Sequence, residues 1–145
     1  MSTERDTVKL LQECDSGVKM SINSLNDAAE KADNEALRKL LKDSVSEHAA
    51  IGREIQEQLR KHNAEGKNPA AIAELMSKLK IGAQLLVNDG DETTAKLMYD
   101  GCSMGIEKLS EYANMYPAAE TEAKNAAEKL IRLEQRLADE LRAYL

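Results

Sequence analysis

Aromatic residues are nearly absent from this sequence. Its 145 residues include no tryptophan, no phenylalanine and only four tyrosines. The core must therefore be built from leucine, isoleucine, valine, methionine and alanine. These side chains suit interdigitating helices better than a β-sheet, where aromatic residues are enriched. At this length the chain can bury a core of its own without disulfide or metal staples. The composition favours a single all-α domain.

Cysteine is also scarce, and the spacing of the two cysteines argues against two classes of site. Cys14 and Cys102 lie far apart in the sequence and belong to no Cys-x-x-Cys or Cys/His pattern. Zinc-ribbon and thioredoxin-type sites therefore have no support. We expect both residues to be free thiols.

Long apolar runs and concentrated positive charge are missing as well. No stretch approaches the roughly 18 apolar residues of a membrane-spanning helix, and the charged segment from Met1 to Val8 does not resemble a secretory signal. Acidic and basic residues are interleaved at a formal net charge of −6, so they form no basic stripe that would neutralise phosphates. We expect a cytoplasmic protein without a membrane or nucleic-acid partner.

Apolar side chains recur every three or four residues in the first half of the chain, which is the spacing of one buried helix face. This periodicity predicts a helix over residues 3–31 and a second over 34–64. Asp33 or Asn34 can cap the second helix, because a short side-chain oxygen accepts from the first free backbone N–H groups. The two helices form the first predicted hairpin.

The second half repeats this organisation after a shorter helical segment. Asn68 and Pro69 are typical of an N-cap followed by the first helical position, and they open a segment over 69–88. Asp91 can then cap a third long helix, and Pro117 marks the predicted start of a fourth. The short segment is therefore a crossover between two hairpins.

A weak internal repeat relates the two hairpins. Cys14 and Gly17 match Cys102 and Gly105 at an offset of 88 residues, each pair being followed by an aliphatic residue. A glycine inside a helix costs about 1 kcal/mol relative to alanine, so matched glycines invite a packing explanation. We hypothesise that they allow the first and third long helices to approach closely.

Two long helical hairpins related by a repeat and joined by a long crossover resemble the ferritin-like superfamily. The chain looks most like the small uncharacterised ferritin-like proteins of bacteria. This resemblance implies one four-helix bundle over residues 1–145 with an extra short helix. Its parts would be a hairpin over 3–64, a crossover helix over 69–88 and a hairpin over 91–144.

The resemblance does not extend to the di-iron centre of ferritin-like enzymes. Those enzymes need Glu-x-x-His on two helices and a further glutamate from each of the others. This sequence contains no Glu-x-x-His, because His48 follows Val45 and His62 follows Leu59 at that spacing. We therefore expect no complete di-metal centre and no cofactor.

Three polar residues nevertheless fall on predicted core positions. Asp15 lies on the stripe of the first helix, and Ser44 and His48 lie on the stripe of the second. Buried polar groups must be hydrogen-bonded, so these residues can form a structural polar cluster. The alternative is a remnant site, in which Glu13, Asp15, Glu47 and His48 hold a single metal ion or a small polar ligand. An interface is the third interpretation.

A nucleophilic role for a cysteine would require a base. In an antiparallel hairpin, Cys14 and His48 are about equally far from the connection, so the two residues could meet. A buried and inert cysteine is the commoner case. Catalytic residues are therefore not predicted.

The predicted function is a non-enzymatic helical bundle that acts through self-association or protein contacts. Residues 69–88 carry more apolar side chains than a surface strap needs, and they are the predicted element of self-association. A degenerate ferritin-like metal-binding protein or oxidoreductase is the alternative. A third possibility is a carrier of a small apolar ligand, since an aliphatic bundle without large aromatics can leave a cavity between helices.

Overall fold

The computed structural model describes residues 2–79 and 90–145. Within these ranges the chain is helical apart from its connections, and it contains no β-strand. This confirms the predicted all-α class. The long helices are α1 (Thr3–Lys31), α2 (Glu35–Lys61), α5 (Asp91–Met115) and α6 (Thr121–Leu141), with the shorter α3 (Pro69–Leu79) and a 3-10 turn at Arg142–Tyr144.

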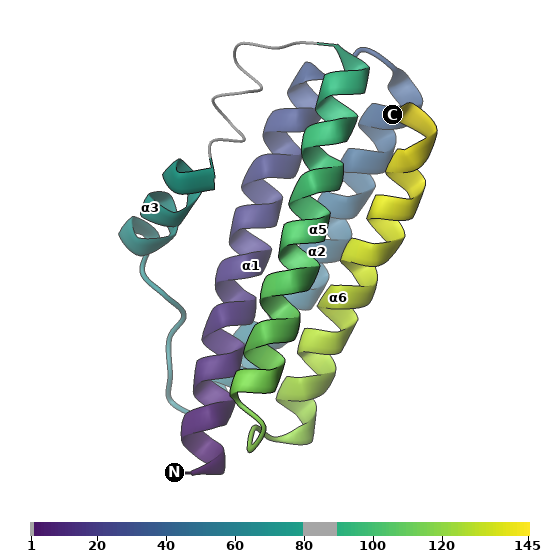
Figure 1. Cartoon of the computed structure of the whole chain (residues 1–145). Coiled ribbons are helices and arrows are strands. Elements are labelled where there is room, and N and C mark those ends of the chain that lie inside the picture. Colours follow the sequence, from purple (N-terminus) through teal and green to yellow (C-terminus); the bar gives the residue numbers. More distant parts are fainter. Residues whose placement is uncertain (1, 80–89) are drawn as a thin grey trace.

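The four long helices lie side by side along a common direction, and α3 lies outside them (Figure 1). α1 packs on α2 and α5 packs on α6, so each sequence hairpin is also a spatial pair. α1 further contacts α5 and α6, and α2 contacts α6. The stripes of all four helices thus face one shared interior.

The core consists almost entirely of aliphatic side chains, as the composition required. Two adjoining clusters divide it along the helix axes. The cluster nearer the N-terminal end of α1 is centred on Leu10, Leu11, Val18, Ile55, Leu59, Leu130 and Leu133. The other cluster is centred on Leu25, Leu37, Leu41, Met98, Leu137 and Leu141. Each buried leucine contributes about 1.5–3 kcal/mol through removal of apolar surface from water.

Two predicted helix caps are confirmed. The side chain of Asn34 accepts from the backbone N–H of Leu37 at 3.1 Å, and that of Asn68 accepts from Ala71 at 2.8 Å. The second helix ends at Lys61, three residues short of our expectation. Asn63 adopts the left-handed conformation, with φ of 52°, which stops the helix there.

We had predicted that Asp91 caps the third long helix, but it is the first residue of that helix. Its carboxylate instead accepts from the backbone N–H groups of Asp33 and Asn34 at 2.8 and 3.0 Å. The cap position is Gly90, whose φ of 115° favours glycine. The carboxylate therefore ties the start of α5 to the connection between α1 and α2.

The start of the last helix is also different from our prediction. α6 begins at Thr121 and not at Pro117. The backbone N–H of Ala118 donates to Asp6 at 3.0 Å, and that of Glu120 donates to Thr7 at 2.8 Å. These bonds to α1 hold the residues after Pro117 in a turn, so helical hydrogen bonding starts later.

The crossover segment is described only over its first part. α3 starts at Pro69, as predicted, and packs on α1 with Ile72 buried. Residues 80–88 of the predicted segment lie outside the described residues. Among the helices described, none combines the length and the apolar character that crossing a membrane requires.

Candidate functional site

A buried hydrogen-bonded cluster connects α2 with α6. His48 is fully buried, and its Nδ1 lies 2.7 Å from the backbone oxygen of Ser44 and 3.2 Å from the Ser44 hydroxyl. On the other side of the ring, Nε2 lies 2.5 Å from Oε1 of Glu134, which is also buried. The hydroxyl of Ser21 on α1 donates to the same carboxylate oxygen at 3.3 Å.

We assign the protons of this cluster from its hydrogen-bond geometry. A backbone carbonyl only accepts, so we assign a hydrogen to Nδ1 of His48. Two lone pairs would repel at the distance between Nε2 and Oε1, so one proton lies between these atoms. The pair is either imidazolium with carboxylate or imidazole with carboxylic acid. In both forms it has no net charge.

The polar cluster predicted from the sequence forms only in part. Ser44 and His48 do bond to each other. Asp15 is buried as predicted, but its ion-pair partner is Lys19, with Nζ 2.7 Å from Oδ2. The segment after α2 covers this carboxylate so closely that a β-carbon at Gly66 would collide with Oδ2. Asp15 thus has a separate structural role.

The remaining candidate metal ligands also have separate partners. Glu13 forms an ion pair with Lys67 at 2.5 Å, and Glu47 pairs with Arg136 on the outer surface. His48 is occupied by Ser44 and Glu134. Across the described ranges, no group of three or more histidine, cysteine, aspartate or glutamate side chains is arranged to hold a metal ion.

The geometry does not activate Cys14 as a nucleophile. Its thiol is buried in the core, and burial raises its pKa to about 12, with the charges of Glu13 and Asp15 adding to the effect. His48 directs both ring nitrogens to Ser44 and Glu134. Cys14 is therefore a protonated core residue at neutral pH.

Two members of the cluster, Ser21 and the buried Glu134, were missed by the sequence analysis. The leucines of the last helix that recur at three- and four-residue steps, Leu130, Leu133 and Leu137, form an apolar stripe that leaves Glu134 out. α6 also buries a second row at helical spacing, in which the glutamate is the one charged residue: Ala127, Ile131, Glu134 and Ala138. A carboxylate that interrupts an apolar row is the signal that could have identified it.

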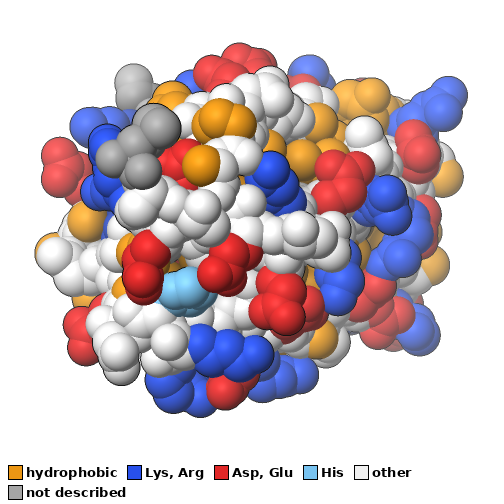
Figure 2. All heavy atoms as spheres, turned by 90° about the horizontal axis from the view of Figure 1, so that it is seen from below, with side chains coloured by type: hydrophobic (Ala, Val, Ile, Leu, Met, Phe, Trp, Pro, Cys, Tyr) orange, Lys and Arg blue, Asp and Glu red, His pale blue; other side chains and the backbone are white. Residues whose placement is uncertain are grey.

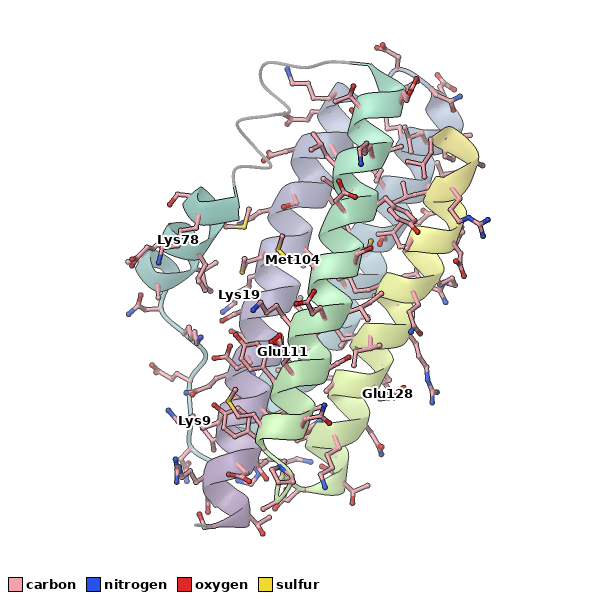
Figure 3. All side chains as sticks on the ribbon, viewed as in Figure 1. Lys9, Lys19, Lys78, Met104, Glu111 and Glu128 are labelled. Atoms are coloured by element: carbon pink, nitrogen blue, oxygen red, sulfur yellow. The ribbon has the colours of Figure 1, made fainter. Side chains whose placement is uncertain are left out.

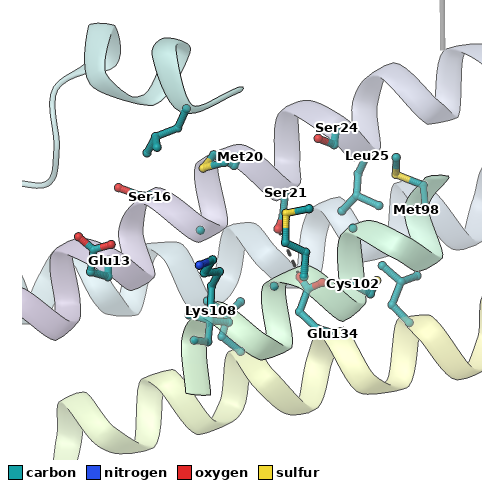
Figure 4. Close-up of a pocket in the computed structure, with 18 of the residues that line it drawn as sticks. Glu13, Ser16, Met20, Ser21, Ser24, Leu25, Met98, Cys102, Lys108 and Glu134 are labelled. Carbon is teal, nitrogen blue, oxygen red and sulfur yellow. Dashed lines mark hydrogen bonds between the residues drawn. The ribbon is translucent and has the colours of Figure 1, made fainter. Parts of the chain in front are cut away.

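A cavity of about 250 Å³ lies between α1 and α5, next to this cluster. α6 closes its inner side, and α3 contributes Leu75 and Lys78 at its edge. Figure 4 shows the lining side chains between the two helices. Small residues leave the space open, because they have too little side chain to fill it: Ser16, Gly17, Ser21, Ser24, Gly101 and Gly105.

We had hypothesised that the matched glycines bring two helix backbones close together. They contribute instead to this cavity. A β-carbon at Gly17 would meet Leu109 and Leu130 at 3.9 and 4.0 Å. A β-carbon at Gly105 would lie 3.5 Å from Oε2 of Glu134. Both glycines line the cavity, so the internal repeat marks its two walls.

The cavity wall is mainly apolar and has a few polar groups. Glu134 and Cys102 lie together on its inner side (Figure 4). The pKa of the Cys102 thiol is raised by burial and further by Glu134, so the thiol is protonated. Ser16 is 3% exposed, and within the described residues its hydroxyl has no hydrogen-bond partner.

The cavity reaches the molecular surface. Met104, which is 39% exposed, and the exposed Lys108 are among its lining residues, so they lie at its rim. Figure 3 labels Met104 on α5 and Lys78 on α3, the two elements that contribute to the rim beside α1. A small molecule could therefore enter between these helices.

Comparison with known proteins found no matching family model, no matching curated protein and no matching solved structure. The functional argument therefore depends on the geometry of the cluster and the cavity.

Proposed function

We propose that this protein binds a small, mostly apolar molecule in the cavity between α1 and α5. The cavity itself is the observation that carries this proposal. Apolar cavities of roughly 150 Å³ hold a benzene-sized molecule, and this one has about 250 Å³. It therefore has room for a molecule somewhat larger than benzene.

The chemistry of the wall supports the same function. Ligand pockets are typically apolar with a small number of fixed polar groups that orient the ligand. Here Met20, Leu25 and Met98 supply apolar surface, while Ser21 and Glu134 supply polar groups.

The proposed function is non-enzymatic. The two thiols are protonated, and the histidine of the site is held between two fixed partners. Self-association through residues 69–88 stays a prediction. In the described part of that segment, Ile72 is buried and Leu75 lines the cavity, so these two apolar side chains make contacts within this chain.

We further propose that the arrangement is a ferritin-like four-helix bundle without the metal centre. Two features support this kinship: the long helices pair as two hairpins, and a helix-containing crossover separates them. The sequence-based alternative, a degenerate metal site, would need ligands that here have other partners.

Binding of two probe molecules tests the proposed function. We expect p-xylene, p-cresol or both to bind the full-length protein in isothermal titration calorimetry. Gly17→Leu fills the cavity, because the added side chain extends from its wall, and should weaken binding at least about tenfold. Ala50→Leu, on the exposed face of α2, is the matched control and should leave binding unchanged.

Ser24→Leu provides a second filling variant from the same wall, in case the first is poorly folded. Circular dichroism and thermal unfolding establish that each variant is folded. If neither probe binds the native protein, or if the filled variants bind as well as the control, the proposed function is wrong.

A further inference from the structure

The cavity wall should select its ligand by a specific polar group as well as by apolar character. We infer that its ligand carries a neutral hydroxyl group, as a phenol or an alcohol, and that this hydroxyl donates to Oε2 of Glu134. The inference rests on the proposed binding function and adds the chemical class of the ligand.

The first step of the argument is that Glu134 presents an acceptor. Its Oε1 already faces His48 and Ser21, at 2.5 and 3.3 Å. Its Oε2 keeps a lone pair whether the shared proton lies nearer the carboxylate or the imidazole. A buried acceptor is stabilised by a hydrogen-bond donor, so a ligand that reaches it should supply an O–H or N–H group.

The second step is that the wall leaves space at this oxygen. The β-carbon of any residue other than glycine at position 105 would lie 3.5 Å from Oε2. Gly105 lacks this atom and lines the cavity, so a donor atom can come within hydrogen-bond distance there. The neighbouring Cys102 offers only a thiol, which is a weak donor, so a hydroxyl would compete with it successfully.

The third step is that the donor should be uncharged. His48 and Glu134 together have no net charge, since one proton is shared between them. A cation would therefore bring an uncompensated charge into an apolar site, which is unfavourable. The nearest further carboxylate in the wall, Glu13, is already paired with Lys67.

The fourth step is that the acceptor is held in place before a ligand arrives. His48 is fixed by the Ser44 carbonyl on α2. Ser21 on α1 donates to the carboxylate of Glu134, as Figure 4 shows. Three helices thus orient one carboxylate, which is the arrangement expected of a preorganised recognition group.

Matched probes test the inference. p-Cresol and p-xylene have nearly the same shape and differ by a hydroxyl in place of a methyl group. We expect the native protein to bind p-cresol at least about tenfold more tightly than p-xylene, because the hydroxyl satisfies Oε2. The cation 4-methylbenzylammonium should bind more weakly than p-cresol.

The same probes are then titrated into variants of the pair. Replacing both residues, as His48→Leu with Glu134→Leu, removes the acceptor without leaving its partner unpaired, and should abolish the preference for p-cresol. Glu134→Gln keeps a carbonyl acceptor and should retain part of it. Glu128→Gln, on the exposed face of α6, is the control and should keep all of it.

Each outcome has a distinct meaning. A native preference for p-cresol that the double variant loses supports the inference. Equal binding of the two probes, tighter binding of the cation, or a preference that persists in the double variant would overturn it while leaving cavity binding intact. Binding of no probe at all would instead contradict the proposed function.

Discussion

At the scale of single residues, His48 and Glu134 form a buried polar pair in an otherwise mainly apolar interior. Each side chain would be costly to bury alone, and each is tolerated because the other shares its proton. Ser44 and Ser21 complete the hydrogen bonding from two further directions. Removal of one partner should therefore be much more harmful than removal of both.

A double-mutant cycle measures this coupling. His48→Leu and Glu134→Leu should each lower the free energy of unfolding by about 3 kcal/mol, because each leaves a buried polar partner unsatisfied. The double variant should lose less than the sum, with a coupling of about 1–3 kcal/mol. Urea unfolding followed by circular dichroism gives all four values, and strictly additive losses would show that the two residues act independently.

The other histidine belongs to a surface cluster at the N-terminal end of α1. His62 lies 3.0 Å from a carboxylate oxygen of Glu4 and 3.3 Å from one of Glu120. Figure 2 views this end, and the histidine visible there between acidic side chains is His62, since His48 is fully buried. The hydrogen bond to Glu4, followed by the nearby Glu120, raises the pKa of His62 despite partial desolvation.

The raised pKa predicts a pH-dependent contribution to stability. Protonated His62 stabilises the folded state fully below its unfolded pKa of about 6.5, and the contribution is lost as the pH rises through the higher folded pKa. His62→Gln should therefore destabilise the protein at about pH 5.5 and have little effect at about pH 8.5. The exposed Lys61→Gln is the control, and a loss for His62→Gln that is equal at both pH values would contradict the assignment.

Sequence patterns identified some of these residues and not others. Ser44 and His48 could be predicted as a buried polar pair because they interrupt a helical stripe. Such a pattern does not show which residue a buried polar side chain bonds to, and Glu134 and Asp15 are examples. Asp15 is satisfied within its own helix by Lys19, whereas Glu134 reaches His48 across the interior. The choice of partner depends on how far neighbouring helices are shifted along their axes. The apolar positions of one helix carry no information about this shift.

At the scale of helices, the sequence predicts that a helix is present better than it predicts the residues at which the helix begins and ends. α1 begins and ends where its apolar periodicity does, and α3 begins at Pro69 as expected. The errors occur where contacts from distant residues decide the ends. Asp91 bonds to the preceding hairpin, and Asp6 holds the turn before α6, so neither boundary follows from local residues alone.

Alanine substitutions of two glycines, Gly17 within α1 and Gly66 after α2, should have opposite effects on stability. Gly17→Ala should raise the free energy of unfolding by about 0.5–1 kcal/mol, because alanine favours the helix and the new β-carbon meets ordinary contacts. Gly66→Ala should lower it by about 1–3 kcal/mol, because the β-carbon would collide with Asp15. Chemical denaturation of both variants checks this, and stabilisation by Gly66→Ala would show that the segment moves freely.

At the scale of the whole molecule, the cavity results from small residues on α1 and α5, of which Gly17 and Gly105 are matched by the internal repeat. The sequence showed the repeat but not its purpose, because whether glycines close or open an interface depends on the side chains opposite them. Here the residues opposite are leucines and a glutamate of α5 and α6, and the space that remains is about 250 Å³. The same wall contains the acceptor that gives the cavity its proposed selectivity.

Methionine methyl groups provide the most direct test of the claim that this cavity binds a ligand. Met20, Met98 and Met104 line it, whereas Met115 is 59% exposed and lies outside its lining. Protein labelled with carbon-13 at these methyl groups would be titrated with p-cresol and followed by NMR. We predict saturable shifts at the three lining methionines and none at Met115. Unchanged spectra, or equal shifts at Met115, would contradict the account.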